Sequence, residues 1–161
     1  LGVDAVDFLG FPDCEIENTR ESRMAVTAAI RRHKPDLIIC QNPNRTKNLG
    51  GSHRDHRAAA GITLDCVYPL ARDHMAFPEL MAQGLEPHRV KEVHMMWWDD
   101  PEVVVDTSDT IDLKIKALQC HVSQLPDLAG MEKRVRERGA VLGKPKGYAY
   151  AETFDRILIE R

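Results

Sequence analysis

Several features that mark special classes of protein are missing from these 161 residues. No apolar run approaches the roughly 20 residues that a membrane-spanning helix needs, so no membrane span is expected. Acidic residues outnumber basic ones, and the formal charge of −3 lacks the basic excess that is typical of nucleic-acid binding. The sequence also has no internal repeat and no low-complexity tract. These absences favour a globular protein without a nucleic-acid partner.

Paired cysteines are also absent. The four cysteines, Cys14, Cys40, Cys66 and Cys120, stand singly, and none forms a Cys-x-x-Cys pair. Their spacing therefore disfavours a cysteine-ligated structural zinc site or a dithiol redox motif. Reduced thiols, most of them buried, in a cytoplasmic protein are the simplest interpretation.

What the sequence does contain is the composition of a globular domain, with 43% hydrophobic and 29% charged residues. Strand-like and helix-like segments alternate along it, which predicts an α/β fold, a Rossmann-like layered domain with a mostly parallel sheet. We interpret residues 1–161 as one domain. Because the chain opens at Leu1 directly in a strand-like segment, we expect the sequence to begin inside that domain, with its N-terminal strand missing.

The expected strands are residues 3–9, 37–40, 90–98 and 103–105. Leu37-Ile38-Ile39-Cys40, which lies between two prolines, is typical of a buried parallel strand that is covered on both faces. Five helices are expected. The first begins at a capping box, Asn18 and Glu21, and ends before Pro35, and the third follows a cap at 106–108. The second, fourth and fifth cover residues 53–67, 132–139 and 148–158.

A polar loop, residues 41–52, lies between the strand at 37–40 and the next expected helix. Such a loop lies at the carboxyl edge of the sheet, where open α/β folds bind their ligands. Directly after it comes Ser52-His53-Arg54-Asp55-His56-Arg57. Two histidines three residues apart point from one face of a helix.

Neutral imidazole is a good zinc ligand, and Asp55 is close enough in sequence to orient an imidazole near it. A histidine that is near such a metal but does not bind it can be a general acid, since its ordinary pKa is about 6.5. The His-x-Asp-His pattern alone leaves two interpretations open, a metal site or a solvated helix start.

Four blocks, in order along the chain, resemble the LmbE/PIG-L family of N-deacetylases. Residues 8–13 are similar to the family's strand that ends in a Pro-Asp-Gly turn, although Cys14 stands where glycine is usual. Residues 44–58 resemble its His-x-Asp-His signature at a helix start. Residues 71–74 with Phe77-Pro78 resemble a family loop, and residues 103–106 followed by 116–124 resemble the strand and helix that end in His-x-Ser-Gln.

The resemblance implies a zinc-dependent hydrolase that removes an acetyl group from an N-acetylated amino sugar or a related N-acyl substrate. It implies that His56 binds Zn2+, and that His53, with Asp55 as its orienting partner, stabilises the oxyanion or protonates the leaving amine. Asp13 and His121 correspond to positions at the substrate cleft. Self-association into a homo-oligomer is expected by analogy, and no residue selects among N-acyl substrates.

The family's other signature, Ala-His-Pro-Asp-Asp, does not occur in the sequence. In the family it supplies two further zinc ligands and the general base, so we expect it before Leu1. The chain by itself, with one zinc ligand of three, is expected to be inactive. The alternative is a truncated or degenerate α/β domain that binds a sugar or serves as a subunit partner. The enzyme interpretation predicts about one zinc per full-length chain, and the alternative predicts none.

Overall fold

The computed structural model describes residues 1–45, 51–96 and 101–160. Its internal contacts divide the chain into two compact units. One unit combines Leu1–Ala5 with Asp99–Phe154, and the other combines Val6–Trp98 with Asp155–Arg161. The interpretation of residues 1–161 as one domain therefore stays a prediction.

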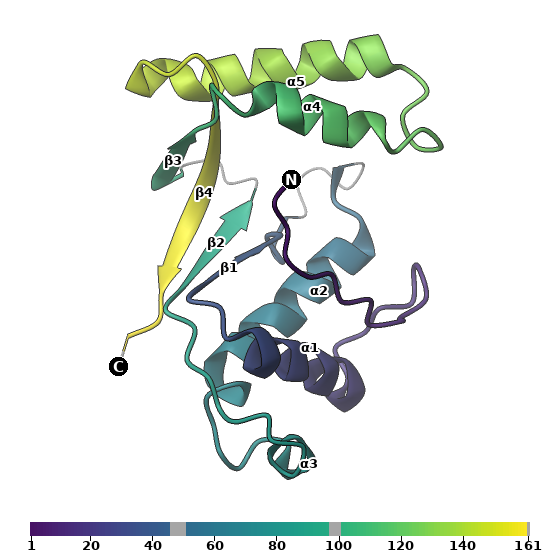
Figure 1. Ribbon diagram of the computed structural model, residues 1–161, viewed down its shortest axis with the longest axis vertical. Helices are drawn as coiled ribbons and strands as arrows, with labels where there is room; N and C mark the ends of the chain where they lie inside the picture. Colours follow the sequence, from purple (N-terminus) through teal and green to yellow (C-terminus); the bar gives the residue numbers. More distant parts are fainter. Residues whose placement is uncertain (46–50, 97–100, 161) are drawn as a thin grey trace. The chain divides into compact units, whose positions relative to one another are not determined.

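The larger unit is built on two helices and a parallel pair of strands. They are α1 (Arg20–His33), β1 (Leu37–Cys40), α2 (Arg54–Asp65) and β2 (Glu92–Met96). A π-helical turn, η2 (Cys66–Leu70), continues α2, and the short α3 (Pro78–Met81) follows. α1 and α2 lie side by side (Figure 1). In the sequence, α2 is the next helix after β1, and its first turn begins at Arg54.

The core of the larger unit draws on both strands and both long helices. Its buried members are Ile30, Cys40, Ile62, Cys66, Val67, Ala71, Val90, Val93 and Met95. Ile62 and Cys66 are four residues apart, so they lie on one face of α2 and its extension. Burial of that face fixes how α2 rotates about its axis, and therefore which side chains its first turn exposes.

A buried arginine ties α1 to the irregular segment after η2. Arg31 is only 1% exposed, and its guanidinium donates to the backbone carbonyls of Leu70, Ala71, Asp73, Ala76 and Leu85 at 2.8–3.4 Å. Burial lowers the pKa of Arg31, but a guanidinium stays charged at neutral pH. Carbonyl oxygens thus take the place of a carboxylate partner around this charge.

The smaller unit contains β3 (Val103–Asp106), α4 (Ile111–Gln119), α5 (Leu128–Gly143) and the 3-10 turn η3 (Lys144–Lys146). β4 (Ala151–Leu158) pairs antiparallel with β3, with Val103 opposite Phe154. α4 and α5 pack on each other and bury Ile111, Ile115 and Met131 (Figure 1). The second half of β4 belongs to the larger unit, where Ile159 just beyond it donates to the carbonyl of Lys91 at 2.9 Å.

The four strands have the order β1-β2-β4-β3, and the predicted α/β class is confirmed. The sheet is not wholly parallel, because β3 and β4 run antiparallel. No helix in the described part of the chain is long and apolar enough to cross a membrane.

For two segments the predicted type of secondary structure is wrong. Residues 151–158, predicted as helix, form β4, because pairing with β3 supplies the backbone partners of a strand. Residues 3–9, predicted as a strand, have no regular structure, and Phe8 is 93% exposed. A strand needs a neighbour for its backbone hydrogen bonds, and these residues have none among the described ones.

Other predictions are right about the element and wrong about a detail. The capping box of α1 is Thr19 with Ser22, whereas Asn18 donates to Asp65. Asp106 accepts from the amide of Ser108 in a turn, and Thr110 is the N-cap of α4. β1 is parallel but not covered on both faces, since Ile39 in this edge strand is 53% exposed.

The helices predicted over 53–67 and within 132–139 are confirmed by α2 with η2 and by α5. The predicted strand 90–98 and the loop 41–52 extend into positions 97–98 and 46–50, which lie outside the described residues.

Candidate active site

A tight turn places Asp13 and Cys14 against the start of α2. The amide of Glu15 donates to the carbonyl of Pro12 at 3.2 Å, and Cys14 has a φ of 66°, in the left-handed region that favours glycine. The amide of Cys14 donates to Asp55 Oδ2 at 2.6 Å, and Arg54 donates to the carbonyl of Cys14. Both backbone groups of Cys14 are thus fixed by residues of α2.

His53 is the N-cap of α2 and uses its ring for this purpose. Its Nδ1 accepts from the amide of Asp55 at 3.3 Å. Because Nδ1 is the acceptor, the neutral imidazole carries its proton on Nε2. The side chain is 45% exposed, and its Nε2 lies 3.5 Å from Cys14 Sγ. His53 therefore presents an N–H group that can donate to a ligand.

Asp55 is the buried member of the site, with its side chain 7% exposed. Its Oδ2 accepts from Cys14, and its Oδ1 lies 3.3 Å from Arg54 Nη1. The sequence suggested that Asp55 orients an imidazole. In the structure the backbone amide of Asp55 makes the hydrogen bond to His53, while Oδ2 lies 3.9 Å from His53 Nδ1.

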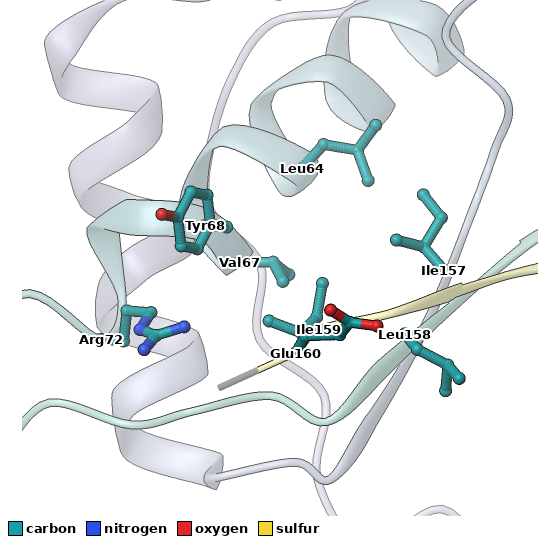
Figure 2. A pocket seen from close by; sticks show the side chains of 8 residues that line it. All are labelled: Leu64, Val67, Tyr68, Arg72, Ile157, Leu158, Ile159 and Glu160. Carbon is teal, nitrogen blue, oxygen red and sulfur yellow. The ribbon is translucent and has the colours of Figure 1, made fainter.

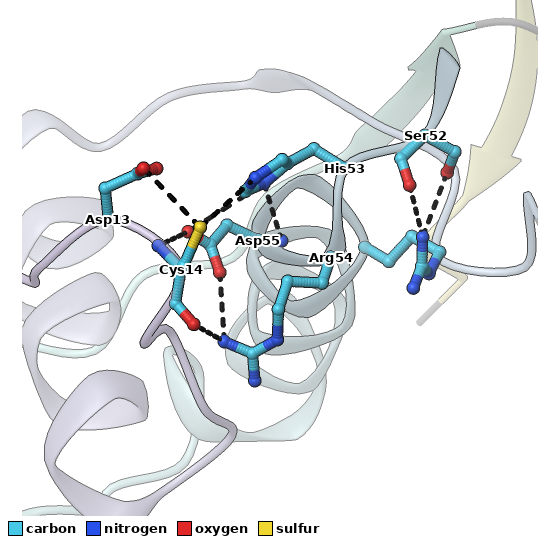
Figure 3. A network of polar contacts seen from close by, with 7 residues as sticks. Asp13, Cys14, Ser52, His53, Arg54 and Asp55 are labelled. Atoms are coloured by element: carbon cyan, nitrogen blue, oxygen red, sulfur yellow. Dashed lines mark hydrogen bonds and ion pairs between the residues drawn. The ribbon is translucent and has the colours of Figure 1, made fainter. Parts of the chain in front are cut away.

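The four residues Asp13, Cys14, His53 and Asp55 form one cluster, shown in Figure 3. Each offers one atom of metal-ligand type, and these atoms all lie within 4.8 Å of one another. Cys14 Sγ lies 3.5 Å from Asp13 Oδ2 and 3.5 Å from His53 Nε2. The hydrogen bond to Asp13, followed by desolvation and the nearby carboxylate charges, raises the pKa of the Cys14 thiol.

His56 lies on the first turn of α2 but outside this cluster. Its exposed ring is centred 5.8 Å from the ring of His53. Within the described ranges, no hydrogen bond engages its imidazole. A free imidazole beside a second histidine fits the donor chemistry of a zinc site. His56 can serve as one ligand, and zinc sites with catalytic function require about three from the protein.

His121 belongs to the smaller unit, in the turn that follows α4. Its amide donates to the carbonyl of Leu118 at 3.0 Å, and its own carbonyl accepts from Gln124 at 3.0 Å. The residue is exposed. Its predicted place at a substrate cleft stays a prediction, as do the roles of the other site residues.

A separate cavity of about 520 Å³ lies in the larger unit between the end of α2 and the end of the chain (Figure 2). Its lining is Leu64, Val67, Tyr68, Arg72, Ile157, Leu158, Ile159 and Glu160. These side chains are mostly apolar, and none of the predicted site residues is among them. The candidate active site therefore lies at the start of α2, where the cluster and His56 are, and not in this cavity.

Sequence reasoning missed two residues of the site, Cys14 and Arg54. It also expected most thiols to be buried, whereas Cys14 and Cys120 are exposed and only Cys40 and Cys66 are buried. Cys14 in place of the usual glycine was a signal, because a turn that favours glycine fixes where the side chain at that position points. Arg54 gave no signal, since its contact to Cys14 joins residues 40 positions apart.

Comparison with known proteins finds a matching family and similar proteins. Residues 1–67 match the family PIG-L, described as GlcNAc-PI de-N-acetylase, and these residues include Asp13, His53, Asp55 and His56. The diacetylchitobiose deacetylase of Thermococcus kodakarensis is 30% identical over 154 residues. Residues 1–67 belong to the PIG-L family. The match to the Thermococcus protein covers 94% of this chain and 56% of that protein, so the chain spans about half the length of this curated relative.

Solved structures are similar to this chain over nearly its whole length. The N,N'-diacetylchitobiose deacetylase of Pyrococcus horikoshii has a TM-score of 0.81 and 26% identity, over 92% of this chain and 55% of that one. A conserved protein of Thermus thermophilus has a TM-score of 0.75 and 26% identity, over 95% of this chain and 66% of that one.

A 4-carboxy-2-hydroxymuconate hydratase of Pseudomonas putida is also similar, with a TM-score of 0.74, over 98% of this chain and 66% of that one. At 18% identity this likeness shows the fold alone. Because one fold can support different reactions, the function of this chain must be argued from its site.

Proposed function

We propose that the protein is a zinc-dependent N-deacetylase that hydrolyses the acetamide of an N-acetylated amino sugar or a related N-acyl substrate. The observation that carries the proposal is the pair of histidines at the start of α2. The ring of His53 is held by a backbone hydrogen bond to Nδ1, which leaves its proton on Nε2, and the ring of His56 makes no hydrogen bond within the described residues. Membership of residues 1–67 in the PIG-L family supports the same chemistry.

In this proposal His56 is a zinc ligand. The remaining ligands and the general base would come from the family's His-Pro-Asp-Asp signature, which these 161 residues do not contain. The chemistry that a bound Zn2+ supplies to amide hydrolysis is polarisation of the carbonyl and activation of water.

His53 would act on the atoms that gain charge or a proton. Its Nε2–H can donate to the oxygen of the tetrahedral intermediate or to the departing amine nitrogen. Asp55 supports it in two ways, since its amide fixes the ring and its carboxylate fixes the Cys14 turn. Loss of one positioned donor at such a site costs on the order of 10²-fold or more in turnover.

The substrate would be a small N-acetylated sugar or glycoconjugate. Asp13, exposed beside His53, is placed to accept a hydrogen bond from a sugar hydroxyl, and we assign a role in substrate binding to His121 by family likeness. N,N'-diacetylchitobiose is the first substrate to test, because two similar proteins are named for it. We further propose a cytoplasmic location and a homo-oligomer.

The test uses the whole gene product. It measures metal binding and turnover separately. His56→Ala should lose bound zinc and activity together, because a ligand is removed. His53→Ala should keep its zinc and lose at least about 10²-fold in acetate release from N,N'-diacetylchitobiose. His33→Ala, at the far end of α1, is the control and should change neither.

Zinc is measured by elemental analysis and acetate by a coupled assay. Full activity in both active-site variants would refute the residue roles. A wild-type protein with neither zinc nor activity would instead support the alternative, a non-catalytic domain that binds a sugar or a subunit partner.

A further inference from the structure

We propose that Asp13, Cys14 and His53 form a further metal site, distinct from the zinc position at His56, that binds a thiophilic divalent cation such as Zn2+ or Cd2+. A cation bound at this site would inhibit the enzyme, because it would coordinate Nε2 of His53 and prevent that atom from donating to the substrate. The inhibition rests on the proposed deacetylase function, whereas the binding of the cation does not.

The distances fit the coordination of a single ion. In a tetrahedral zinc site with bonds of about 2.0–2.3 Å, neighbouring ligand atoms are roughly 3.4–3.7 Å apart. Cys14 Sγ lies 3.5 Å from both Asp13 Oδ2 and His53 Nε2. Two edges of the coordination polyhedron therefore already have the required length, with the sulfur atom at their common corner (Figure 3).

The backbone holds the thiol in this position. Cys14 has a positive φ, its amide donates to Asp55, and its carbonyl accepts from Arg54. His53 is fixed independently through Nδ1. Three ligand atoms from two separate segments of the chain thus lie close together before an ion binds, which lowers the entropic cost of binding it.

The donor set determines which cations bind. One thiolate, one imidazole and one carboxylate suit Zn2+, Cd2+ and Co2+, whereas Mg2+ and Ca2+ prefer oxygen ligands. The carboxylates of Asp13 and Asp55 add negative charge around the thiol and attract a cation. On binding, the Cys14 thiol releases its proton to solvent, and the proton of His53 moves from Nε2 to Nδ1. Nδ1 then gives up the hydrogen bond from the Asp55 amide and faces Asp55 Oδ2, 3.9 Å away.

This coordination has a direct consequence for the proposed reaction. His53 Nε2 is the atom that would donate to the oxyanion or the leaving amine, and the same atom would be bound to the cation. The ion would also occupy the space beside Asp13, where we place a sugar hydroxyl. Excess zinc should therefore inhibit an enzyme that needs zinc at His56.

The test uses Co2+ as the probe, in the His56→Ala variant so that only the further site remains. Titration should produce a sulfur-to-cobalt charge-transfer absorption that saturates at one ion per chain. The additional change Cys14→Ser should abolish the band, and His53→Ala should weaken binding at least tenfold. Cys120→Ser removes the other exposed thiol and should leave the band unchanged. A band that is absent, or that disappears only with Cys120→Ser, would overturn the proposal.

Inhibition is measured separately, as the Cd2+ concentration that halves acetate release. Cys14→Ser should raise this concentration at least tenfold relative to wild type, whereas equal inhibition of both proteins would overturn the inhibitory role. A cobalt band without any deacetylase activity would leave the metal site in place and refute the proposed function. Deacetylase activity without a cobalt band would support the proposed function and refute the further metal site.

Discussion

The two histidines at the start of α2 differ in what holds them, and this difference supports their separate roles. His53 accepts a backbone hydrogen bond at Nδ1 and is fixed as a proton donor, whereas the ring of His56 is engaged by no hydrogen bond within the described ranges. A metal ligand needs a free lone pair, and a general acid needs a fixed proton. The first turn of α2 carries one histidine of each kind, which fits the roles that we propose for them.

The reactivity of the thiols is a prediction at this scale. Burial raises the pKa of Cys40 and Cys66 to about 11, so both remain protonated and shielded at pH 8. Iodoacetamide should therefore modify Cys14 and Cys120 in the native protein, and the other two only in denaturant. Mass spectrometry of tryptic peptides measures this pattern. Native labelling of Cys40 or Cys66 would show that the described core is wrong.

The sequence was sufficient to find the histidines but not their surroundings. His-x-Asp-His after a buried strand and a polar loop has a local signature, so its position at the start of α2 was predicted. The contacts of Cys14 to His53 and Asp55 join residues 39 and 41 positions apart. Such contacts depend on how two segments pack, and no spacing in the sequence encodes them.

At the scale of elements, packing decided where periodicity was ambiguous. Residues 151–158 have apolar side chains at spacings that fit a helix as well as a strand, and the antiparallel partner β3 decides for a strand. α1, β1 and α2 were predicted because proline stops and strong periodicity mark them locally. Arg31 was overlooked, since its five carbonyl partners come from a segment without regular periodicity.

Arg31 should be the most costly side chain to remove from α1. Arg31→Met keeps an apolar chain of similar length but leaves several buried carbonyls without a donor, and should lower the free energy of unfolding by about 3 kcal/mol. Arg32→Met, the next residue, loses only an exposed ion pair with Asp7 and should cost less than about 1 kcal/mol. Urea denaturation measures both, and equal effects would contradict the anchoring role of Arg31.

Replacement by alanine is predicted to have opposite effects on stability at two helical glycines. A Cβ at Gly61 in α2 would meet nothing within 4 Å, so Gly61→Ala should stabilise the protein by up to about 1 kcal/mol through helix propensity. A Cβ at Gly143, the last residue of α5, would lie 2.6 Å from the carbonyl oxygen of Tyr148. Gly143→Ala should therefore destabilise the protein. Thermal unfolding distinguishes the two, and a gain in stability for Gly143→Ala would contradict the close packing of this segment.

At the scale of the whole molecule, the likeness to proteins that are named deacetylases and the residues of the site each support the proposed chemistry. The likeness extends over both units, while the candidate catalytic residues at the start of α2 all lie in the larger one. The similar hydratase shows that the fold by itself does not determine the reaction. The function therefore depends on whether a metal ion is held at the start of α2.

Removal of the metal gives a prediction for the whole protein. Dialysis against a chelator should abolish acetate release from N,N'-diacetylchitobiose, and one equivalent of Zn2+ per chain should restore it. Addition of several further equivalents should reduce it again, because His53 then becomes a ligand. Activity that survives complete chelation would exclude a metal-dependent reaction.

Anomalous diffraction at the zinc edge tests the central claim most directly, with crystals of the gene product that contain one equivalent of zinc. The account predicts a single strong peak about 2.1 Å from a ring nitrogen of His56. A peak that lies only among Asp13, Cys14 and His53, or a His56 ring without metal contact, would contradict it.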